Sequence, residues 1–324
     1  MRAWPVVVLL WLVGCAPYQQ VPGAIVGPPM LTDHALTTAD GKTLALNRWQ
    51  PPAGTEPGAV LLALHGFNDY RRAFALPAPC LADAGIVTYA YDQRGFGEDP
   101  EAGLWAGSRA MVDDVATAVA LVRRRHPGLP VFLLGESMGA AVVLSALTRA
   151  DVAAGVDGAV LVAPAVWGWS TLNFFYRATL WVTAHTARGW RLTGRGLNIV
   201  PTDNIDVLRA MSRDPLVIKA ARVDAVYGLV SLMEEALDGA PTVAVPTLVL
   251  YGDRDEIIPR RPVDRLIASL PESNRTIIYP QGYHMLLRDL QGPVVWQDIA
   301  GFVATHTNGT TRPPTALPDS CFVN

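Results

Sequence analysis

The sequence is short of charged residues and of cysteine, and each shortage excludes a class of protein. Charged side chains make up 17% of the 324 residues, and 26 Lys and Arg against 29 Asp and Glu give a net charge of −3. A nucleic-acid-binding surface needs an excess of basic residues, so we expect no nucleic-acid partner. The three cysteines form no Cys-x-x-Cys and no metal-ligand spacing, so we expect no metal site.

A long apolar run is also missing from the N-terminus. The run from Trp4 to Val13 follows Arg2 and is too short to span a bilayer comfortably, which is typical of a cleaved signal peptide. The next residues, Leu12-Val13-Gly14-Cys15, resemble a bacterial lipobox. That resemblance implies a lipoprotein signal peptide over residues 1–14 and lipidation of Cys15. The alternative is a plain secretory signal with an incidental cysteine.

Residues 15–30 contain Pro22, Pro28 and Pro29 and are expected to form a tether between membrane and domain. Several acyl chains on Cys15 would anchor the protein stably. Ala16 is not the aspartate that in many Gram-negative bacteria retains lipoproteins at the inner membrane. The expected location is therefore the bacterial cell envelope, lipid-anchored at the periplasmic face of the outer membrane.

Apolar runs alternate with helical patterns along most of the chain. Continuous apolar runs suit strands that are buried on both faces of a parallel sheet. Strands are expected at residues 59–64, 86–90, 131–134, 159–162, 247–251 and 276–279, after a hairpin at residues 32–49. Helices are expected at residues 71–84, 109–125, 138–149, 262–270 and 294–305. The alternation predicts an α/β fold with a doubly wound, mostly parallel sheet, whose ligands bind at the C-terminal ends of the strands.

One interval breaks this alternation and is rich in Trp and Phe. We expect a helical cap at about residues 165–240, inserted over the C-terminal edge of the sheet. Trp167, Trp169, Phe174 and Phe175 are candidate substrate-binding residues that would form an apolar wall or a membrane-facing lid. The alternative for these aromatic residues is core packing within the insertion.

The main domain is expected to cover residues 31–306, and residues 307–324 to be a disordered tail rich in Pro and Thr. Cys80 lies in an apolar helical stretch and is most simply a buried small hydrophobe. Cys321 lies in the tail. A disulfide between them requires an oxidising compartment, and the sequence leaves their pairing open.

The segment Gly135-Glu136-Ser137-Met138-Gly139 carries the most specific chemical signal. An apolar run precedes it and an Ala-rich helical run follows it. A serine nucleophile on a sharp strand-to-helix turn needs small residues two positions before and after it, because strand and helix backbones approach closely there. The helix that begins at Met138 would direct its positive N-terminal end toward an oxyanion beside Ser137. The alternative is an ordinary Gly-flanked serine in a loop.

A serine hydroxyl needs a general base and an acid that orients the base. Of the six histidines, His284 follows the last expected strand, where it could reach Ser137. The acid should follow the strand at residues 247–251. Asp253, Asp255 and Glu256 all qualify there, and reasoning from the residues alone leaves the choice open.

An oxyanion hole needs two backbone N–H donors. One is the amide of the residue after the nucleophile, Met138. The second is expected in the loop after an early strand, where Gly66 lets the backbone turn inward and Phe67 supplies the amide. The alternative is an ordinary turn between strand and helix.

The chain resembles an α/β-hydrolase of the monoglyceride lipase and lysophospholipase branch. The matching segments, in order, are His65-Gly66, Tyr91 to Gly97, Gly135 to Gly139, Gly252 to Asp255 with Ile258-Pro259, and Gly282 to His284. They span residues 31 to 303 approximately. The resemblance implies the α/β-hydrolase fold, and its Gly-x-x-Asp pattern places the acid at Asp255.

The resemblance implies a serine hydrolase that cleaves carboxylic esters through Ser137, His284 and Asp255, without a cofactor. The apolar cap and the expected anchor favour a lipidic ester, such as a monoacylglycerol or lysophospholipid. A short-chain carboxylesterase, a thioesterase and an amidase share this triad. The alternative of another class is a non-catalytic envelope lipoprotein that uses the fold for binding.

Overall fold

The structure is a computed structural model that describes residues 16–194, 196–271, 274–307 and 313–322. The expected signal peptide and Cys15 lie outside the described residues. A nine-stranded sheet forms the centre, with the strand order β1-β2-β3-β5-β4-β6-β7-β10-β11. The parallel strands are β4 (Ala59–Leu64), β5 (Ile86–Tyr91), β6 (Val131–Glu136), β7 (Gly158–Val162), β10 (Thr247–Gly252) and β11 (Arg275–Tyr279). The expected mostly parallel α/β sheet is confirmed.

One edge of the sheet is antiparallel. It consists of β1 (Met30–Leu31), β2 (Ala35–Thr37) and β3 (Thr43–Trp49). Strands β2 and β3 form the expected hairpin, with Ala35 opposite Ala45. This edge adds strands to the sheet without contributing residues to the site described below.

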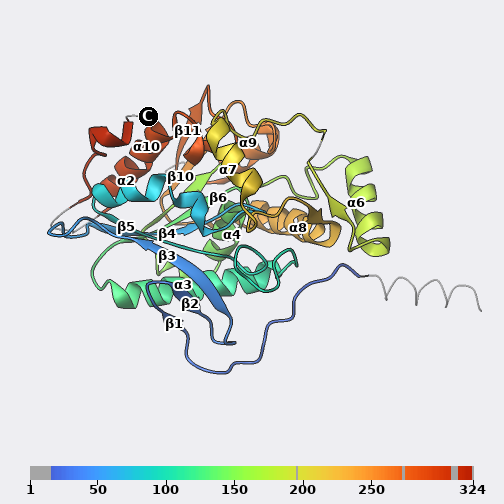
Figure 1. Cartoon of the computed structure of the whole chain (residues 1–324), viewed down its shortest axis with the longest axis horizontal. Coiled ribbons are helices and arrows are strands. Elements are labelled where there is room, and N and C mark those ends of the chain that lie inside the picture. The colour runs from blue at the N-terminus through green and yellow to red at the C-terminus, as the bar shows by residue number, and fades with distance from the viewer. Residues whose placement is uncertain (1–15, 195, 272–273, 308–312, 323–324) are drawn as a thin grey trace, which may run out of the picture.

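Helices cover both faces of the sheet, which explains why its central strands β4, β5, β6, β7 and β10 are buried at every position. Helices α2 (Pro77–Asp83) and α10 (Gly292–Thr305) pack on one face, and α3 (Ser108–Arg125) and α4 (Met138–Leu147) pack on the other (Figure 1). The remaining elements outside the cap are α5 (Ala150–Ala153), α9 (Arg260–Ser269), η1 (Arg71–Phe74), η2 (Ala240–Thr242), η3 (Leu286–Arg288) and η4 (Asp319–Phe322).

The helix expected at residues 71–84 is divided in two. The 3-10 helix η1 ends at Phe74, and α2 begins at Pro77. Proline has no backbone N–H and disfavours a helical conformation at the residue before it, so it starts a helix more readily than it continues one. The single-helix prediction was therefore wrong at this point.

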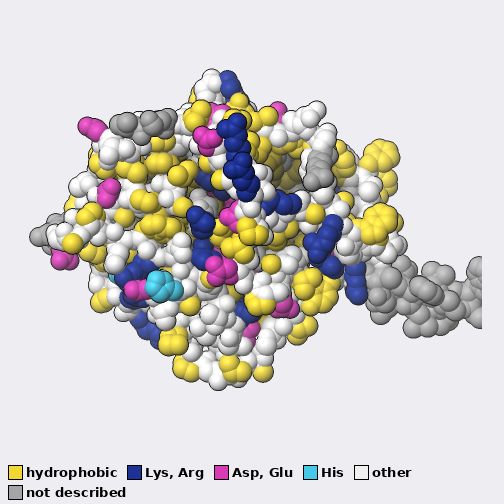
Figure 2. Space-filling model, in the orientation of Figure 1, with side chains coloured by type: hydrophobic (Ala, Val, Ile, Leu, Met, Phe, Trp, Pro, Cys, Tyr) yellow, Lys and Arg dark blue, Asp and Glu magenta, His cyan; other side chains and the backbone are white. Residues whose placement is uncertain are grey.

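The insertion between β7 and β10 is helical. It holds α6 (Phe174–Thr186), α7 (Ile205–Arg213) and α8 (Val223–Gly239), with a short ribbon of β8 (Arg191–Leu192) and β9 (Ala221–Arg222) that the sequence did not indicate. Helix α8 packs against α4, while α6 lies at the outer end of the molecule (Figure 1). Figure 2 shows hydrophobic side chains on the surface at that end.

Both terminal segments are packed more tightly than expected. Gln20, in the expected tether, is buried and hydrogen-bonds to Leu104 and Trp105. In the tail, Leu317 is buried and Cys321 forms a disulfide with Cys80. The expectation of disorder was wrong for residues 313–322, because the disulfide and the burial of Leu317 hold them against α2 and α10.

Candidate active site

Ser137 lies on a sharp turn between β6 and α4. Its backbone has a positive φ of 54°, a conformation that costs free energy in a non-glycine residue. A Cβ atom at Gly135 would lie 2.4 Å from the backbone of Gly139 and Ala140, and one at Gly139 would lie 2.0 Å from the Leu64 oxygen. The two glycines therefore permit the close approach that holds Ser137 at the end of its strand.

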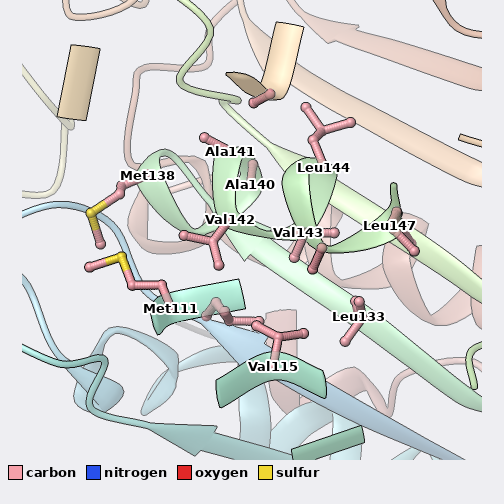
Figure 3. Packing of buried hydrophobic residues seen from close by; sticks show 14 of the residues in the cluster. Met111, Val115, Leu133, Met138, Ala140, Ala141, Val142, Val143, Leu144 and Leu147 are labelled. Carbon is pink, nitrogen blue, oxygen red and sulfur yellow. The ribbon is translucent and has the colours of Figure 1, made fainter. Parts of the chain in front are cut away.

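Helix α4 keeps this turn in place by packing. All ten of its residues are buried. Figure 3 shows Met138 and Val142 on the side of α4 that faces Met111 and Val115 of α3. A turn that is strained by itself is thus held between a buried strand and a buried helix.

His284 comes from the loop after β11 and lies within hydrogen-bond distance of Ser137. Its Nε2 atom is 2.9 Å from Ser137 Oγ. Glycines again allow the approach, since a Cβ at Gly252 would lie 2.4 Å from the backbone oxygen of Gly282. Because β10 and β11 are neighbours in the sheet, the loops that follow them meet at one edge.

Asp255 lies on the other side of the imidazole. Its Oδ2 atom is 2.7 Å from His284 Nδ1, and its Oδ1 atom accepts hydrogen bonds from the amides of Ile257 and Ile258. The other two carboxylates point elsewhere: Asp253 pairs with Arg260, and Glu256 accepts from the amide of Val200. The geometry thus favours Asp255 over both alternatives.

The two expected oxyanion donors lie next to Ser137. Met138 begins α4, and Phe67 follows Gly66, whose added Cβ would lie 3.3 Å from Ser137 Cβ. Among the hydrogen bonds of the described residues, none is donated by the amide of Phe67 or Met138. Both amides are therefore free to donate to an oxyanion.

A cavity of about 960 Å³ extends from Ser137 and His284 into the cap. Its walls are mainly apolar side chains from the cap and from the edge of the sheet. Members from the cap include Leu172, Leu180, Leu208, Met211, Leu229 and Met233. The volume lies near the upper end of the roughly 300–1,000 Å³ that is typical of small-molecule sites.

The four candidate aromatic residues of the cap have different surroundings. Trp167 lines the cavity. Trp169 does not: its indole donates a hydrogen bond to Ser231 and packs against Tyr227. Phe174 and Phe175 do not line the cavity either, since they are 75% and 77% exposed, so of the two expected arrangements only the membrane-facing lid stays a prediction for them. They begin α6, which turns these two side chains outward.

Three charged residues in the cavity wall were missed at the sequence level. Arg288 donates hydrogen bonds to Asp69 and Glu136, and all three are buried. Asp69 and Arg288 stand 219 positions apart, so no local pattern could reveal the pair. In the described part of the chain, no cluster of residues suited to a metal ion is present.

Comparison with known proteins shows the family of the chain. Residues 55–291 match the family described as serine aminopeptidase, S33. The chain belongs to this family. It is 30% identical over 296 residues to the monoglyceride lipase of Homo sapiens, an alignment that covers 86% of this chain and 93% of that protein.

A bacterial relative is also similar over nearly its whole length. The monoacylglycerol lipase of Mycolicibacterium smegmatis is 26% identical over 297 residues, covering 85% of this chain and 98% of that protein. Among solved structures, a monoglyceride lipase from Saccharomyces cerevisiae has a TM-score of 0.71 at 19% identity, covering 90% of this chain and 99% of its own. The S33 chain described here therefore has the α/β-hydrolase fold and is a serine ester hydrolase.

Proposed function

We propose that the protein hydrolyses the ester bond of single-chain lipids, a monoacylglycerol or a lysophospholipid. The observation that carries the proposal is the apolar cavity of about 960 Å³ that ends at Ser137. A buried apolar chain contributes about 0.8 kcal/mol for each CH₂ removed from water, so such a cavity favours a long acyl chain. The lipase relatives named above support the same substrate class.

The proposed reaction uses Ser137 as nucleophile. Ser137 Oγ attacks the ester carbonyl while His284 Nε2 takes its proton, and Asp255 stabilises the resulting imidazolium. The amides of Phe67 and Met138 donate hydrogen bonds to the oxyanion. The protonated His284 then gives its proton to the leaving alcohol oxygen, which leaves an acyl-enzyme.

Water completes the proposed reaction. His284 takes a proton from a water molecule, whose oxygen attacks the acyl carbonyl. As the second oxyanion collapses, Ser137 Oγ leaves and regains its proton from His284. The products are a fatty acid and glycerol, or the glycerophospho-alcohol of a lysophospholipid, and the enzyme returns to its first state.

We further propose that the protein is anchored in the bacterial envelope through Cys15, with its cap toward the membrane. Arg188, two residues after the end of α6, donates a hydrogen bond to the backbone oxygen of Ala16, so the described chain begins beside the cap. Exposed apolar residues lie on α6 and in the segment after it, among them Phe174, Phe175 and Trp190. No helix in the described residues is long and apolar enough to cross a membrane.

The test of the anchor is the variant Cys15→Ser, which should move the protein from the membrane fraction to the soluble fraction with its turnover unchanged. Retention of that variant in the membrane fraction would contradict the anchor.

The test of the activity is turnover by the full-length chain on a chain-length series of p-nitrophenyl esters, monoacylglycerol and lysophosphatidylcholine. Ser137→Ala should abolish turnover. Ser145→Ala is the matched control, since Ser145 lies on the same helix and its buried hydroxyl has no hydrogen-bond partner. Serine-dependent turnover that rises with acyl length supports the proposal.

Other outcomes of that experiment separate the alternatives. Turnover confined to short esters would make the protein a small-ester carboxylesterase. Faster cleavage of an acyl thioester or of an aminoacyl anilide than of any ester would reassign the site to a thioesterase or an amidase. A folded protein that neither turns over these substrates nor reacts with a fluorophosphonate probe would favour the non-catalytic binding protein.

A further inference from the structure

A buried ion cluster lies beside the proposed triad, and the reaction above makes no use of it. The Arg288 guanidinium donates to Asp69 Oδ2 at 2.6 Å and to Glu136 Oε2 at 2.9 Å. Each of the three side chains is less than a tenth exposed. Two carboxylates and one cation therefore share a pocket wall from which water is largely excluded.

Each member of the cluster stands next to a different part of the proposed machinery. Asp69 follows Phe67 by two positions, and Glu136 immediately precedes Ser137. Arg288 is four residues after His284, in η3. One guanidinium thus links the three segments that carry the oxyanion amide, the nucleophile and the base.

Two polar atoms of the cluster are shielded from solvent. Arg288 Nε and Glu136 Oε1 are buried and have no hydrogen-bond partner. Burial raises the pKa of the Glu136 carboxyl, and the attraction of Arg288 opposes that rise. A role through neighbouring residues fits this placement better than direct contact with the reacting ester.

Stability alone gives a weak reason for such a cluster. Taking charges out of water is costly, and well-packed apolar residues are often as stabilising as a buried ion pair. The guanidinium instead fixes the relative positions of the two carboxylates, because its planar fork directs separate N–H groups at them. A lysine ammonium is a compact point charge without this fork.

We propose that Arg288 is a positioning residue that holds the Phe67 amide, Ser137 and His284 in one arrangement through Asp69 and Glu136. The inference rests on the proposed function, since it assigns a task within that reaction. Misplacement of reacting groups by about 1 Å can lower a rate about 100-fold. Loss of the guanidinium should therefore lower kcat and leave the binding of the acyl chain nearly unchanged.

The test compares Arg288→Met with Arg94→Met in the full-length chain. Arg94 is a matched control because it is as buried as Arg288 and also bridges two carboxylates, Asp40 and Asp114, which lie outside the cavity. We expect kcat for a p-nitrophenyl ester to fall about 100-fold in Arg288→Met, with KM within about twofold. Arg94→Met should lose stability but keep kcat per folded molecule within about threefold.

Inhibitor binding separates positioning from a general loss of structure. A boronic acid that mimics the oxyanion should bind Arg288→Met more weakly by a factor similar to the fall in kcat/KM. A non-cleavable ether analogue of the lipid should bind equally to both proteins. Arg288→Lys, which keeps the charge but not the fork, should recover part of the lost kcat.

Two isosteric variants serve if Arg288→Met does not fold. Asp69→Asn and Glu136→Gln each weaken one arm of the cluster and should lower kcat about tenfold, with KM kept. A kcat in Arg288→Met, or in both isosteric variants, that stays within threefold of wild type would overturn the inference while leaving the proposed function in place. A wild-type protein without Ser137-dependent turnover would overturn both.

Discussion

Helices α4 and α6 show how differently the two parts of the molecule are built. All ten residues of α4 are buried between the sheet and its neighbouring helices. Of the thirteen residues of α6, only Ala184 is buried, and its first two residues are exposed phenylalanines. Both helices are rich in apolar residues, so apolar composition alone does not decide which of them becomes core.

The difference assigns separate tasks to core and cap. The core holds the strained Ser137 turn, and its tight packing leaves little freedom to the groups around it. The cap combines an apolar cavity wall with an exposed apolar surface, an arrangement suited to receiving a lipid. If this division is correct, substitutions in the core should lower turnover of every substrate. Substitutions on the exposed face of the cap should lower turnover only when the substrate is supplied in a lipid surface.

Asp255→Asn should cause the largest loss. An asparagine at this position favours the wrong imidazole tautomer, and turnover should fall about 10⁴-fold on soluble and lipid esters alike. The measurement is kcat/KM for both substrates. Asp253→Asn, an exposed neighbour paired with Arg260, is the control and should stay within twofold of wild type. Equal losses in the two variants would refute the choice of Asp255.

Gly139→Ala should be the most damaging glycine change. Its Cβ would lie 2.0 Å from the Leu64 oxygen, so strand and helix must separate. We expect a loss of about 3 kcal/mol in the free energy of unfolding, from overpacking, together with loss of turnover. Gly194→Ala in the cap has no atom within 4 Å and should change stability by less than about 0.5 kcal/mol. Urea unfolding measures both, and a stable, active Gly139→Ala would contradict the argument.

Loss of the disulfide should weaken the core without affecting the cap. Cys80 and Cys321 close a loop of 241 residues, and such a link contributes about 2–4 kcal/mol. Cys80→Ala combined with Cys321→Ser should lower the unfolding midpoint and leave kcat unchanged. The control is the wild-type protein with reductant, whose unfolding midpoint should equal that of the double variant. A midpoint that responds to neither treatment would show that the tail contributes nothing to stability.

Phe174→Ser with Phe175→Ser should affect activity only at a lipid surface. Burying one phenylalanine contributes roughly 1.5–3 kcal/mol, so turnover of monoacylglycerol in vesicles should fall at least about tenfold. Turnover of a soluble short ester should stay within twofold. Val294→Ser, an exposed apolar residue on α10, is the control and should change neither rate. An equal fall in turnover of both substrates would contradict the separate tasks of core and cap.

Asp289→Asn should have the smallest effect on turnover, because Asp289 does not line the cavity, while its effect on stability should depend on pH. Burial raises the pKa of Asp289 from 3.8 to about 6 in the folded protein. A raised folded pKa favours the folded state fully below pH 3.8, and that contribution is lost as the pH rises through about 6. Since each unit of pKa shift corresponds to about 1.4 kcal/mol, the variant should exceed wild type by up to about 3 kcal/mol at pH 8 and equal it at pH 3.5. Urea unfolding of both proteins at four pH values measures this difference in stability. A difference that is the same at every pH would contradict the raised pKa.

Much of the core could be predicted because its signals are local. The strands expected at residues 59–64 and 247–251 match β4 and β10 within one residue, since strands buried on both faces of a sheet form nearly continuous apolar runs. The glycines around Ser137 indicated a tight turn for a steric reason that the structure bears out. The cap was expected from an absence of strands, and its small β8–β9 ribbon was too short to leave a pattern.

Several features of the site required the tertiary structure. The residues alone left three acids open, and distance to His284 favours one of them. The orientation of Phe174 and Phe175 depends on how α6 packs, which apolar composition does not specify. The tail and its disulfide, too, depend on contacts across 241 positions.

The sequence by itself determined the parallel sheet, the strand-to-helix turn at Ser137 and the position of His284 after the last strand, because periodicity and steric clearance act between residues close in the chain. The choice of Asp255 came only from the family resemblance, and the tertiary structure shows its contact with His284. Only the tertiary structure decided that Arg288 joins Asp69 to Glu136, and which aromatic residues of the cap face outward. Those contacts join segments that the sheet brings together from distant parts of the chain, so local sequence patterns cannot predict them.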